Sequence, residues 1–187
     1  MTDSDLQETL LSKEVIQEGI ITRMEHWTVR LPNGDTAIRE VSCHPGAAAV
    51  VALDPEDRVI LVRQMRVAVG RITLEIPAGK FDHPGEDPLE CAKRELSEET
   101  GMKADSWRKL TVLETTPGFC NERIHIFLAS GLHSGSRHPD PDEFVDTLRM
   151  PLDEACAHVM DGSFHDGKTC LGLLMAQCLR ASQTQND

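Results

Sequence analysis

The sequence predicts an α/β fold in which a mixed β-sheet lies between helices, with an antiparallel β-hairpin region added before it. Two observations lead to this prediction. Short apolar segments recur between turn-forming residues, as strands do, and helical patterns interrupt them without the regular alternation of a doubly wound parallel sheet. The length of 187 residues suits one domain with an appended segment. We therefore expect a hairpin region over residues 1–45 and a main domain over residues 46–187.

The hairpin region is predicted from its turn. Residues 20–31 and 36–42 are strand-like segments on either side of Asn33-Gly34. Asn-Gly is the strongest short-range signal for a hairpin, because tight hairpin turns need residues that tolerate a positive φ. An antiparallel pair of strands is expected here.

The strands of the main domain are predicted from apolar runs that end in turns. The run over residues 47–53 is separated from the run over residues 58–64 by Asp54-Pro55-Glu56-Asp57. A short strand then leads into Pro77-Ala78-Gly79. This strand and the remaining ones are expected over residues 72–76, 110–113, 124–128 and 144–150.

One helix is predicted together with both of its ends. Asp87 is a favourable N-cap, Pro88 suits the first helical position and Glu90 completes a capping box. Gly101 supplies the left-handed residue with which many helices end. Leu89, Ala92 and Leu96 share the side expected to face the core. Two further helices are expected over residues 152–160 and 168–179, the second with an apolar stripe at Leu171, Leu174, Met175 and Cys178.

Composition and charge exclude several classes of protein. The chain has 19 Lys and Arg against 31 Asp and Glu, a net charge of −12, which argues against a nucleic-acid or anionic membrane surface. No segment approaches the roughly 18 apolar residues of a membrane span, and the acidic first residues show no secretory signal. We expect a cytoplasmic protein that binds neither nucleic acid nor membrane and keeps its six cysteines reduced.

Three glutamates of the first expected helix are candidate metal ligands. Glu95, Glu98 and Glu99 are spaced i, i+3 and i+4, so their carboxylates converge on one face. A solvated acidic face is the alternative interpretation. Three oxygen ligands on a rigid element suit Mg²⁺ or Mn²⁺, hard cations that also bind phosphate oxygens. Arg94, which we count among the catalytic residues, is expected to hold the carboxylates by ion pairs.

The same segment resembles the signature of the Nudix family. The Nudix box is written G-x5-E-x7-R-E-U-x-E-E-x-G-U, where U is an aliphatic residue. Here Glu86 is followed, after seven residues, by a segment with every fixed position filled, Arg94-Glu95-Leu96-Ser97-Glu98-Glu99-Thr100-Gly101-Met102. The sequence departs from the box at one place, because six residues instead of five separate Gly79 from Glu86. This departure concerns the loop and leaves the helix ligands unaffected.

Flanking segments resemble the ADP-ribose pyrophosphatase branch of the family, and the resemblance covers about residues 20–180. It implies a Nudix-type α/β/α sandwich that uses Mg²⁺ to hydrolyse the diphosphate of ADP-ribose or a related nucleoside diphosphate sugar. The products are then a nucleoside monophosphate and a sugar phosphate. The segments that carry this resemblance are Val62–Arg66, Leu74–Lys80, Pro117–Phe119, Asp142–Val145, Pro151–Ala155 and Asp166–Thr169.

The resemblance also implies roles for particular residues. Glu95, Glu98 and Glu99 would bind the metal that bridges the diphosphate. The backbone carbonyl of Ala78 would be a further metal ligand beside the substrate. In this branch the general base often lies on a loop after the box, which favours Glu143, with Glu98 as the alternative.

Two more residues are expected to contact the substrate. Arg66 lies near a strand end, in a segment that supplies a phosphate-binding arginine in relatives. Trp27 is expected to stack on the base across a dimer interface, with simple packing in the hairpin as the alternative. In this branch the N-terminal region commonly exchanges between two subunits, which implies a homodimer.

Other functions remain open from the sequence alone. A GDP-mannose-type or broad-specificity sugar-nucleotide hydrolase would carry the same box with a different specificity pocket. A non-catalytic Nudix module that senses ADP-ribose is expected to have lost its metal-binding glutamates, whereas all three are present here. An acidic metal buffer or interaction protein would account for the net charge but not for the box.

Overall fold

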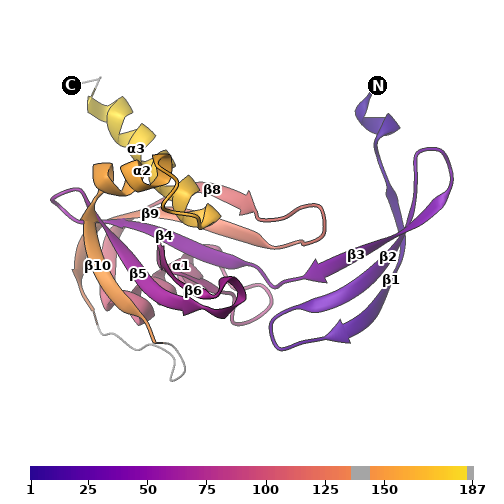
Figure 1. Cartoon of the computed structure of the whole chain (residues 1–187), viewed down its shortest axis with the longest axis horizontal. Helices are drawn as coiled ribbons and strands as arrows, with labels where there is room; N and C mark the ends of the chain where they lie inside the picture. Colours follow the sequence, from indigo (N-terminus) through magenta and orange to yellow (C-terminus); the bar gives the residue numbers. More distant parts are fainter. Residues whose placement is uncertain (136–143, 185–187) are drawn as a thin grey trace. The chain divides into compact units, whose positions relative to one another are not determined.

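The computed structural model describes residues 1–135 and 144–184 of the chain (Figure 1). The chain divides into two compact units. The first consists of Met1–Gly46 and Glu114–Arg123, and the second of Ala47–Leu113 and Ile124–Asp187. A segment from the middle of the sequence therefore belongs with the N-terminal residues.

The first unit is built on a three-stranded antiparallel sheet with the order β1-β2-β3. The hairpin predicted at Asn33-Gly34 joins β2 to β3, with Arg30 opposite Thr36 and Gly34 at a φ of 93°. The predicted hairpin is confirmed, and a third strand lies beside it. The elements of this unit are the 3₁₀ turn η1 (Asp3–Asp5) and the strands β1 (Thr9–Glu18), β2 (Arg23–Arg30) and β3 (Thr36–Cys43).

The additional strand β1 was not predicted because its apolar residues do not alternate with a period of two. The pairing register with β2 shifts between Leu10 and Ser12 and again between Val15 and Gln17. Each shift falls at a pair of adjacent apolar residues, the second being Val15-Ile16. Such β-bulges interrupt the alternation from which strands are recognised.

The segment Glu114–Arg123 is joined to the first unit by backbone hydrogen bonds to the end of β3. The amide of Ser42 donates to the carbonyl of Phe119 at 2.8 Å, and the Ser42 carbonyl accepts from Asn121 at 3.2 Å. The side chain of Asn121 also accepts a hydrogen bond from the amide of His44 at 2.8 Å. These contacts hold Pro117-Gly118-Phe119 beside the N-terminal sheet.

The second unit contains a seven-stranded mixed sheet with the order β10-β5-β4-β9-β8, to which β6 is added at β5 and β7 at β4. Strands β4 and β9 are parallel, whereas β4–β5 and β5–β10 are antiparallel. The bounds of these elements are β4 (Ala47–Leu53), β5 (Arg58–Arg66), η2 (Val67–Val69), β6 (Arg71–Glu75), β7 (Ala78–Lys80), α1 (Pro88–Thr100), β8 (Met102–Glu114), β9 (Arg123–Ser134), β10 (Asp146–Pro151), α2 (Leu152–Met160) and α3 (Gly167–Thr184).

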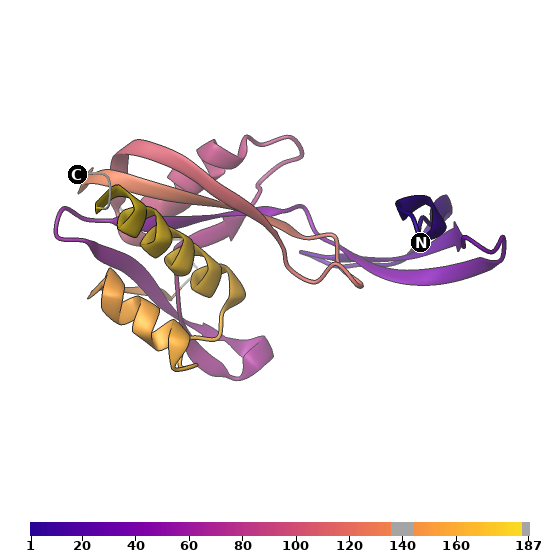
Figure 2. The same cartoon turned by 90° about the horizontal axis from the view of Figure 1, so that it is seen from above.

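Helices cover both faces of this sheet, as Figures 1 and 2 show. Strand β4 is apolar throughout because alternate side chains enter the two core layers. Ala49 and Val51 pack in the layer of α2 and α3, whereas Ala48 and Val50 pack in the layer of α1. The predicted α/β/α sandwich with a mixed sheet is confirmed.

The helices agree well with the sequence prediction. Asp87 caps α1, since its Oδ1 accepts from the amides of Leu89 at 2.8 Å and Glu90 at 3.2 Å. Gly101 ends the helix with a φ of 70°. The reciprocal half of the expected capping box is replaced by an ion pair of Glu90 with Lys93 at 2.7 Å. None of the helices in the described ranges is long and apolar enough to cross a membrane.

One strand is much longer than predicted. The sequence indicated residues 110–113, whereas β8 runs from Met102 to Glu114. Its first half carries Lys, Asp, Ser and Arg, which hide the strand pattern. Trp107 in this half packs against the core layer of α1, so tertiary packing decides the strand.

Candidate active site

Helix α1 presents an acidic face to the neighbouring backbone of β7. Glu95 and Glu99 are buried, with 8% and 2% of their surface exposed, whereas Glu98 lies closer to solvent with about a third of its side chain exposed. The end signals Asp87 and Gly101 fix where the helix begins and ends, and hence which residues share this face. The i, i+3, i+4 spacing places Glu95, Glu98 and Glu99 on the same side of α1.

Arg94 holds this face together. Its Nη1 lies 2.6 Å from Glu95 and 3.0 Å from Glu98, and its Nε lies 3.3 Å from Glu86 and 3.2 Å from Asp82. Burial disfavours the charged guanidinium, but Glu95 and Glu86 outweigh it, so the pKa of Arg94 is above its ordinary value. The expected ion pairs are therefore formed, and Asp82 joins them without having been singled out in the sequence.

The loop before α1 accommodates its additional residue in a turn. The amide of Glu86 donates to the carbonyl of His83 at 3.2 Å, and Gly85 has a φ of 84° that favours glycine. The amide of Asp82 donates to the Glu86 carboxylate at 2.7 Å. The turn keeps Glu86 within reach of Arg94 despite the longer spacing from Gly79.

Strand β7 approaches α1 so closely that a side chain at position 79 would displace the carboxylate of Glu95. A Cβ built on Gly79 would lie 2.1 Å from the carboxylate of Glu95. One residue earlier, the amide of Ala78 donates to Oε2 of Glu99 at 3.1 Å. The backbone at the predicted ligand Ala78 thus lies beside the acidic face, which is where a further oxygen ligand would be needed.

The donors of this site suit a hard divalent ion, because they are carboxylates beside the backbone of β7. Their arrangement is that of an ion-paired cluster, in which Arg94 binds Glu95 and Glu98 and the Ala78 amide binds Glu99. Within the described ranges, no group of three or more acidic, histidine or cysteine side chains is arranged to hold a metal ion.

Arg66 lies at the end of β5 and forms a two-pronged ion pair. Its Nε and Nη2 donate to the two carboxylate oxygens of Glu75 at 2.8 and 2.7 Å. Glu75 also contacts the ammonium of Lys168. Burial alone raises the pKa of a carboxyl, but Arg66 and Lys168 outweigh it and lower the pKa of Glu75 to about 2. Neither Glu75 nor Lys168 was among the predicted site residues.

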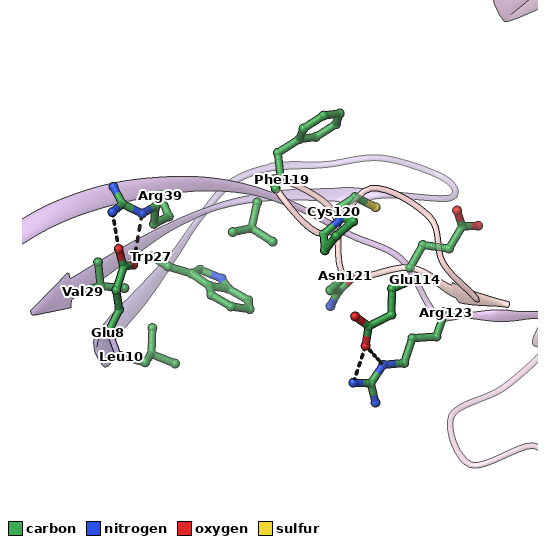
Figure 3. A pocket seen from close by; sticks show the side chains of 14 residues that line it. Glu8, Leu10, Trp27, Val29, Arg39, Glu114, Phe119, Cys120, Asn121 and Arg123 are labelled. Atoms are coloured by element: carbon green, nitrogen blue, oxygen red, sulfur yellow. Dashed lines mark hydrogen bonds and ion pairs between the residues drawn. The ribbon is translucent and has the colours of Figure 1, made fainter. Parts of the chain in front are cut away.

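Trp27 lies in the first unit, on the wall of a pocket of about 670 Å³ (Figure 3). Its Nε1 donates to Glu25 at 2.6 Å, and the ammonium of Lys13 lies 4.0 Å from the ring centroid. The pocket lining combines apolar and charged side chains and includes Phe119 of the segment held at β3. The lining residues are Glu8, Leu10, Trp27, Val29, Arg39, Val41, Glu114, Pro117, Gly118, Phe119, Cys120, Asn121, Glu122 and Arg123.

The structure thus brings together most of the predicted residues of the second unit. Arg94 pairs with Glu95 and Glu98, and Glu99 accepts from the amide of Ala78. Arg66 is held by its hydrogen bonds to Glu75. These bonds, together with the negative charge of Glu99, raise the pKa of Arg66 above its ordinary value. The predicted base Glu143 lies outside the described residues, and Trp27 belongs to the other unit.

Comparisons with known proteins agree with this geometry. Residues 44–169 match the NUDIX domain. The "Methanol dehydrogenase activator" of Bacillus methanolicus is 38% identical over 94% of this chain and 95% of its own. The "ADP-ribose pyrophosphatase" of Bacillus subtilis is 40% identical over 96% of this chain and 98% of its own.

A solved structure shows the same similarity in three dimensions. The "Crystal structure of ADP compounds hydrolase" superposes with a TM-score of 0.79 and 27% sequence identity, covering 95% of this chain and 97% of that one. Both the sequence match and the fold therefore extend over nearly the whole chain. The arrangement of the box on α1, the mixed sheet and these similarities lead to one conclusion: the chain belongs to the Nudix hydrolase family and resembles its ADP-ribose pyrophosphatase branch.

Proposed function

We propose that the protein is a Mg²⁺-dependent pyrophosphatase that hydrolyses ADP-ribose, or a related nucleoside diphosphate sugar, to a nucleoside monophosphate and a sugar phosphate. The observation that carries this proposal is the acidic face of α1, held by Arg94 against the backbone of β7. The diphosphate of such a substrate carries two negative charges, shared among four non-bridging oxygens. A cation must neutralise this charge before water can attack. The similarity to an ADP-ribose pyrophosphatase over nearly the whole chain supports the substrate class.

In this proposal Glu95, Glu98 and Glu99 hold the metal, with the carbonyl of Ala78 as a further ligand. A bound divalent ion would lower the pKa of a water molecule and neutralise charge on the diphosphate, with Mn²⁺ as the alternative to Mg²⁺. The positive charge of Arg94 offsets the repulsion between the carboxylates of Glu95 and Glu98 and holds both on one side of α1. Binding an ion requires Glu95 and Glu98 to turn from the guanidinium toward it.

Other residues of the chain bind the substrate and take the proton from the attacking water. Arg66 contacts a phosphate through the edge of its guanidinium that does not face Glu75. Trp27 stacks on the base. Glu143 takes the proton from the attacking water, and Glu98 is the alternative base. Because Trp27 lies in the unit with the N-terminal sheet, we propose that two copies form a homodimer in which this unit completes the substrate pocket.

A substrate panel tests the proposed function. Purified protein is incubated with ADP-ribose, GDP-mannose and UDP-glucose, each with Mg²⁺, Mn²⁺ or EDTA, and the products are identified by mass spectrometry. We expect AMP and ribose 5-phosphate as the main products, and their loss with EDTA. Preferential release of GMP and mannose 1-phosphate would instead identify the GDP-mannose-type hydrolase, and binding of ADP-ribose without turnover would identify a sensing module.

A second candidate function is activation of a dehydrogenase. The Bacillus methanolicus relative is named "Methanol dehydrogenase activator", and its similarity covers 94% of the present chain. Adding the protein to the methanol dehydrogenase of that organism, with and without Mg²⁺, tests the candidate. A rate increase that depends on Glu99 would support it, whereas an unchanged rate alongside rapid ADP-ribose hydrolysis would favour the pyrophosphatase.

A further inference from the structure

A buried cluster of charges lies between the end of β6 and the start of α3. Glu75, with 2% of its surface exposed, accepts from Arg66 on both oxygens, from Thr73 at 2.6 Å and from the ammonium of Lys168. Burying a carboxylate is costly unless it is paired. The four donors from three elements fix the plane of the Glu75 carboxylate, and with it the plane of the guanidinium of Arg66.

The start of α3 fixes Lys168 in turn. Lys168 is 9% exposed and also pairs with Asp166 at 3.0 Å. The same Asp166 oxygen accepts from the amide of Thr169 at 3.0 Å, and the hydroxyl of Thr169 accepts from the amide of Ile76 at 2.9 Å. The helix start is therefore tied to the end of β6 and the residue after it by two separate contacts, one to the side chain of Glu75 and one to the backbone of Ile76.

Arg66 is the exposed end of this chain of contacts. About two fifths of its side chain is exposed, whereas Glu75 and Lys168 behind it are buried. Both bonds to Glu75 use Nε and Nη2, so Nη1 has no hydrogen-bond partner among the residues that the structure describes. An arginine held on one edge and open on the other is preorganised to bind a phosphate, because little side-chain entropy is then lost on binding.

We propose that Lys168 and Glu75 are positioning residues that act through Arg66, so that the start of α3 sets the orientation of the cation that receives the substrate's diphosphate. This inference rests on the proposed function, since it needs Arg66 to contact a phosphate. It adds that the contact depends on a lysine 102 positions away in the sequence, on an element that carries none of the proposed metal ligands.

The first test is Lys168→Met, which removes the ammonium and keeps most of the stem. We expect KM for ADP-ribose to rise about tenfold with kcat within threefold of wild type, because a phosphate contact is made in the ground state and the transition state alike. Lys168→Arg, which retains the charge, should restore most of the lost affinity. A loss of folded protein alone would lower kcat and leave KM unchanged, which would overturn the proposal.

Two control variants separate positioning from general effects. Lys109→Met removes an exposed lysine of β8, and should leave KM unchanged. Asp54→Asn breaks another buried ion pair, with Arg58 at 2.9 Å at the opposite end of β5, and should lower the melting temperature without changing KM. If Asp54→Asn raises KM as much as Lys168→Met does, the effect is one of stability and the proposal fails.

A double-mutant cycle tests whether Lys168 acts through Arg66. In an Arg66→Gln background the guanidinium is absent, so adding Lys168→Met should change KM by less than twofold. Multiplication of the two single effects would show that Lys168 acts independently and would overturn the proposal. If Lys168→Met does not fold, Lys168→Gln takes its place in the same cycle.

Binding of Mg²⁺-pyrophosphate, measured by calorimetry, distinguishes failure of this inference from failure of the proposed function. The probe carries the diphosphate but neither base nor sugar, and its binding needs no turnover. We expect Lys168→Met to weaken it about tenfold relative to wild type, even if the preferred substrate is not ADP-ribose. Equal binding by wild type, Lys168→Met and Arg66→Gln would overturn the positioning role, while a wild type that binds pyrophosphate but hydrolyses none of the panel would contradict only the hydrolase proposal.

Discussion

At the scale of single residues, Arg94 lies at the centre of the acidic cluster on α1. The guanidinium of Arg94 meets four carboxylates within 3.3 Å, so each acid is held by a charge-assisted contact. Glu99 is held separately, by the amide of Ala78. Residues on one helix face thus differ in their partners, and their substitutions should differ in effect.

Glu99→Gln should lower kcat at least ~10²-fold, because it removes the charge of a proposed metal ligand while changing little volume. The melting temperature should stay within a few degrees of wild type, since an amide oxygen can still accept from Ala78. Glu90→Gln on the same helix, outside the acidic face, is the matched control and should keep full activity. Near-normal turnover of Glu99→Gln at saturating Mg²⁺ would show that the metal assignment is wrong.

The two candidate bases differ in the step that they serve. If Glu143 is the base, Glu143→Gln should lower kcat strongly with little change in KM or in Mg²⁺ dependence, because a base that binds no metal acts only in the chemical step. Glu98→Gln should instead raise the Mg²⁺ concentration needed for half-maximal rate. Steady-state kinetics at several Mg²⁺ concentrations decide between them. Loss of turnover in Glu98→Gln at saturating metal, with Glu143→Gln unaffected, would place the base on the helix.

At the scale of elements, the approach of β7 to α1 determines the shape of the site. The absence of a side chain at Gly79 lets the Glu95 carboxylate lie against the strand. The ion pair of Glu75 with Arg66 joins the end of β6 to the end of β5. Both contacts join residues from different elements. The first can be tested by a substitution at Gly79, and the second by the pH dependence of stability.

Gly79→Ala should reduce activity at least tenfold with only a small loss of stability. The added Cβ would meet the carboxylate of Glu95 at 2.1 Å, and this flexible end of a side chain can move aside. The fold is then preserved while a proposed metal ligand is displaced. Gly167→Ala is the control, since its Cβ would have no described heavy atom within 4 Å. Kinetics with thermal denaturation check both, and full activity of Gly79→Ala would contradict the proposed role of Glu95.

The ion pair of Glu75 should make stability depend on pH in an acidic window. Its pKa is lowered from 4.5 to about 2 in the folded protein, so its stabilising contribution is complete above pH 4.5 and is lost as the pH falls toward 2. Between pH 7 and pH 3, the difference in unfolding free energy between wild type and Glu75→Gln should therefore shrink by roughly 2 kcal/mol. Urea denaturation between pH 7 and pH 3 measures it. A difference that does not change with pH would contradict the assignment.

At the scale of the whole molecule, the N-terminal unit is expected to act through assembly. Its sheet exposes large apolar side chains, among them Leu10, Val15 and Ile38, each at least two fifths exposed. Trp27 belongs to this unit, whereas the acidic face of α1 belongs to the other. Both observations support the proposal that a second copy is needed for a complete substrate pocket.

Deleting residues 1–33 should therefore abolish both the dimer and the activity, because it removes β1, β2 and Trp27 together. Light scattering at micromolar concentration and the substrate assay measure the two effects. Trp27→Ala in the full chain is the companion variant, which should raise KM while leaving the dimer intact. A wild type that is monomeric and fully active would contradict the proposal.

Features of this protein that depend on neighbouring residues along the chain could be predicted from its residues alone. The start and end of α1, the shared face of Glu95, Glu98 and Glu99, and the hairpin at Asn33-Gly34 all follow from capping, helical spacing and turn preference. These signals act over a few residues, so a single sequence displays them completely.

Contacts between residues far apart in the sequence could not be predicted, because they depend on how the elements pack. Lys168 reaches Glu75 across 93 positions, Gly79 fits against Glu95 because two elements approach closely, and the segment Glu114–Arg123 pairs with β3. No pattern of neighbouring residues predicts these contacts, because they form only when distant elements pack together. Packing also buries polar and charged groups, which must then find partners. The proposed metal-binding glutamates all lie on α1. The strands β6 and β7 and the start of α3 fix the positions of the residues around them.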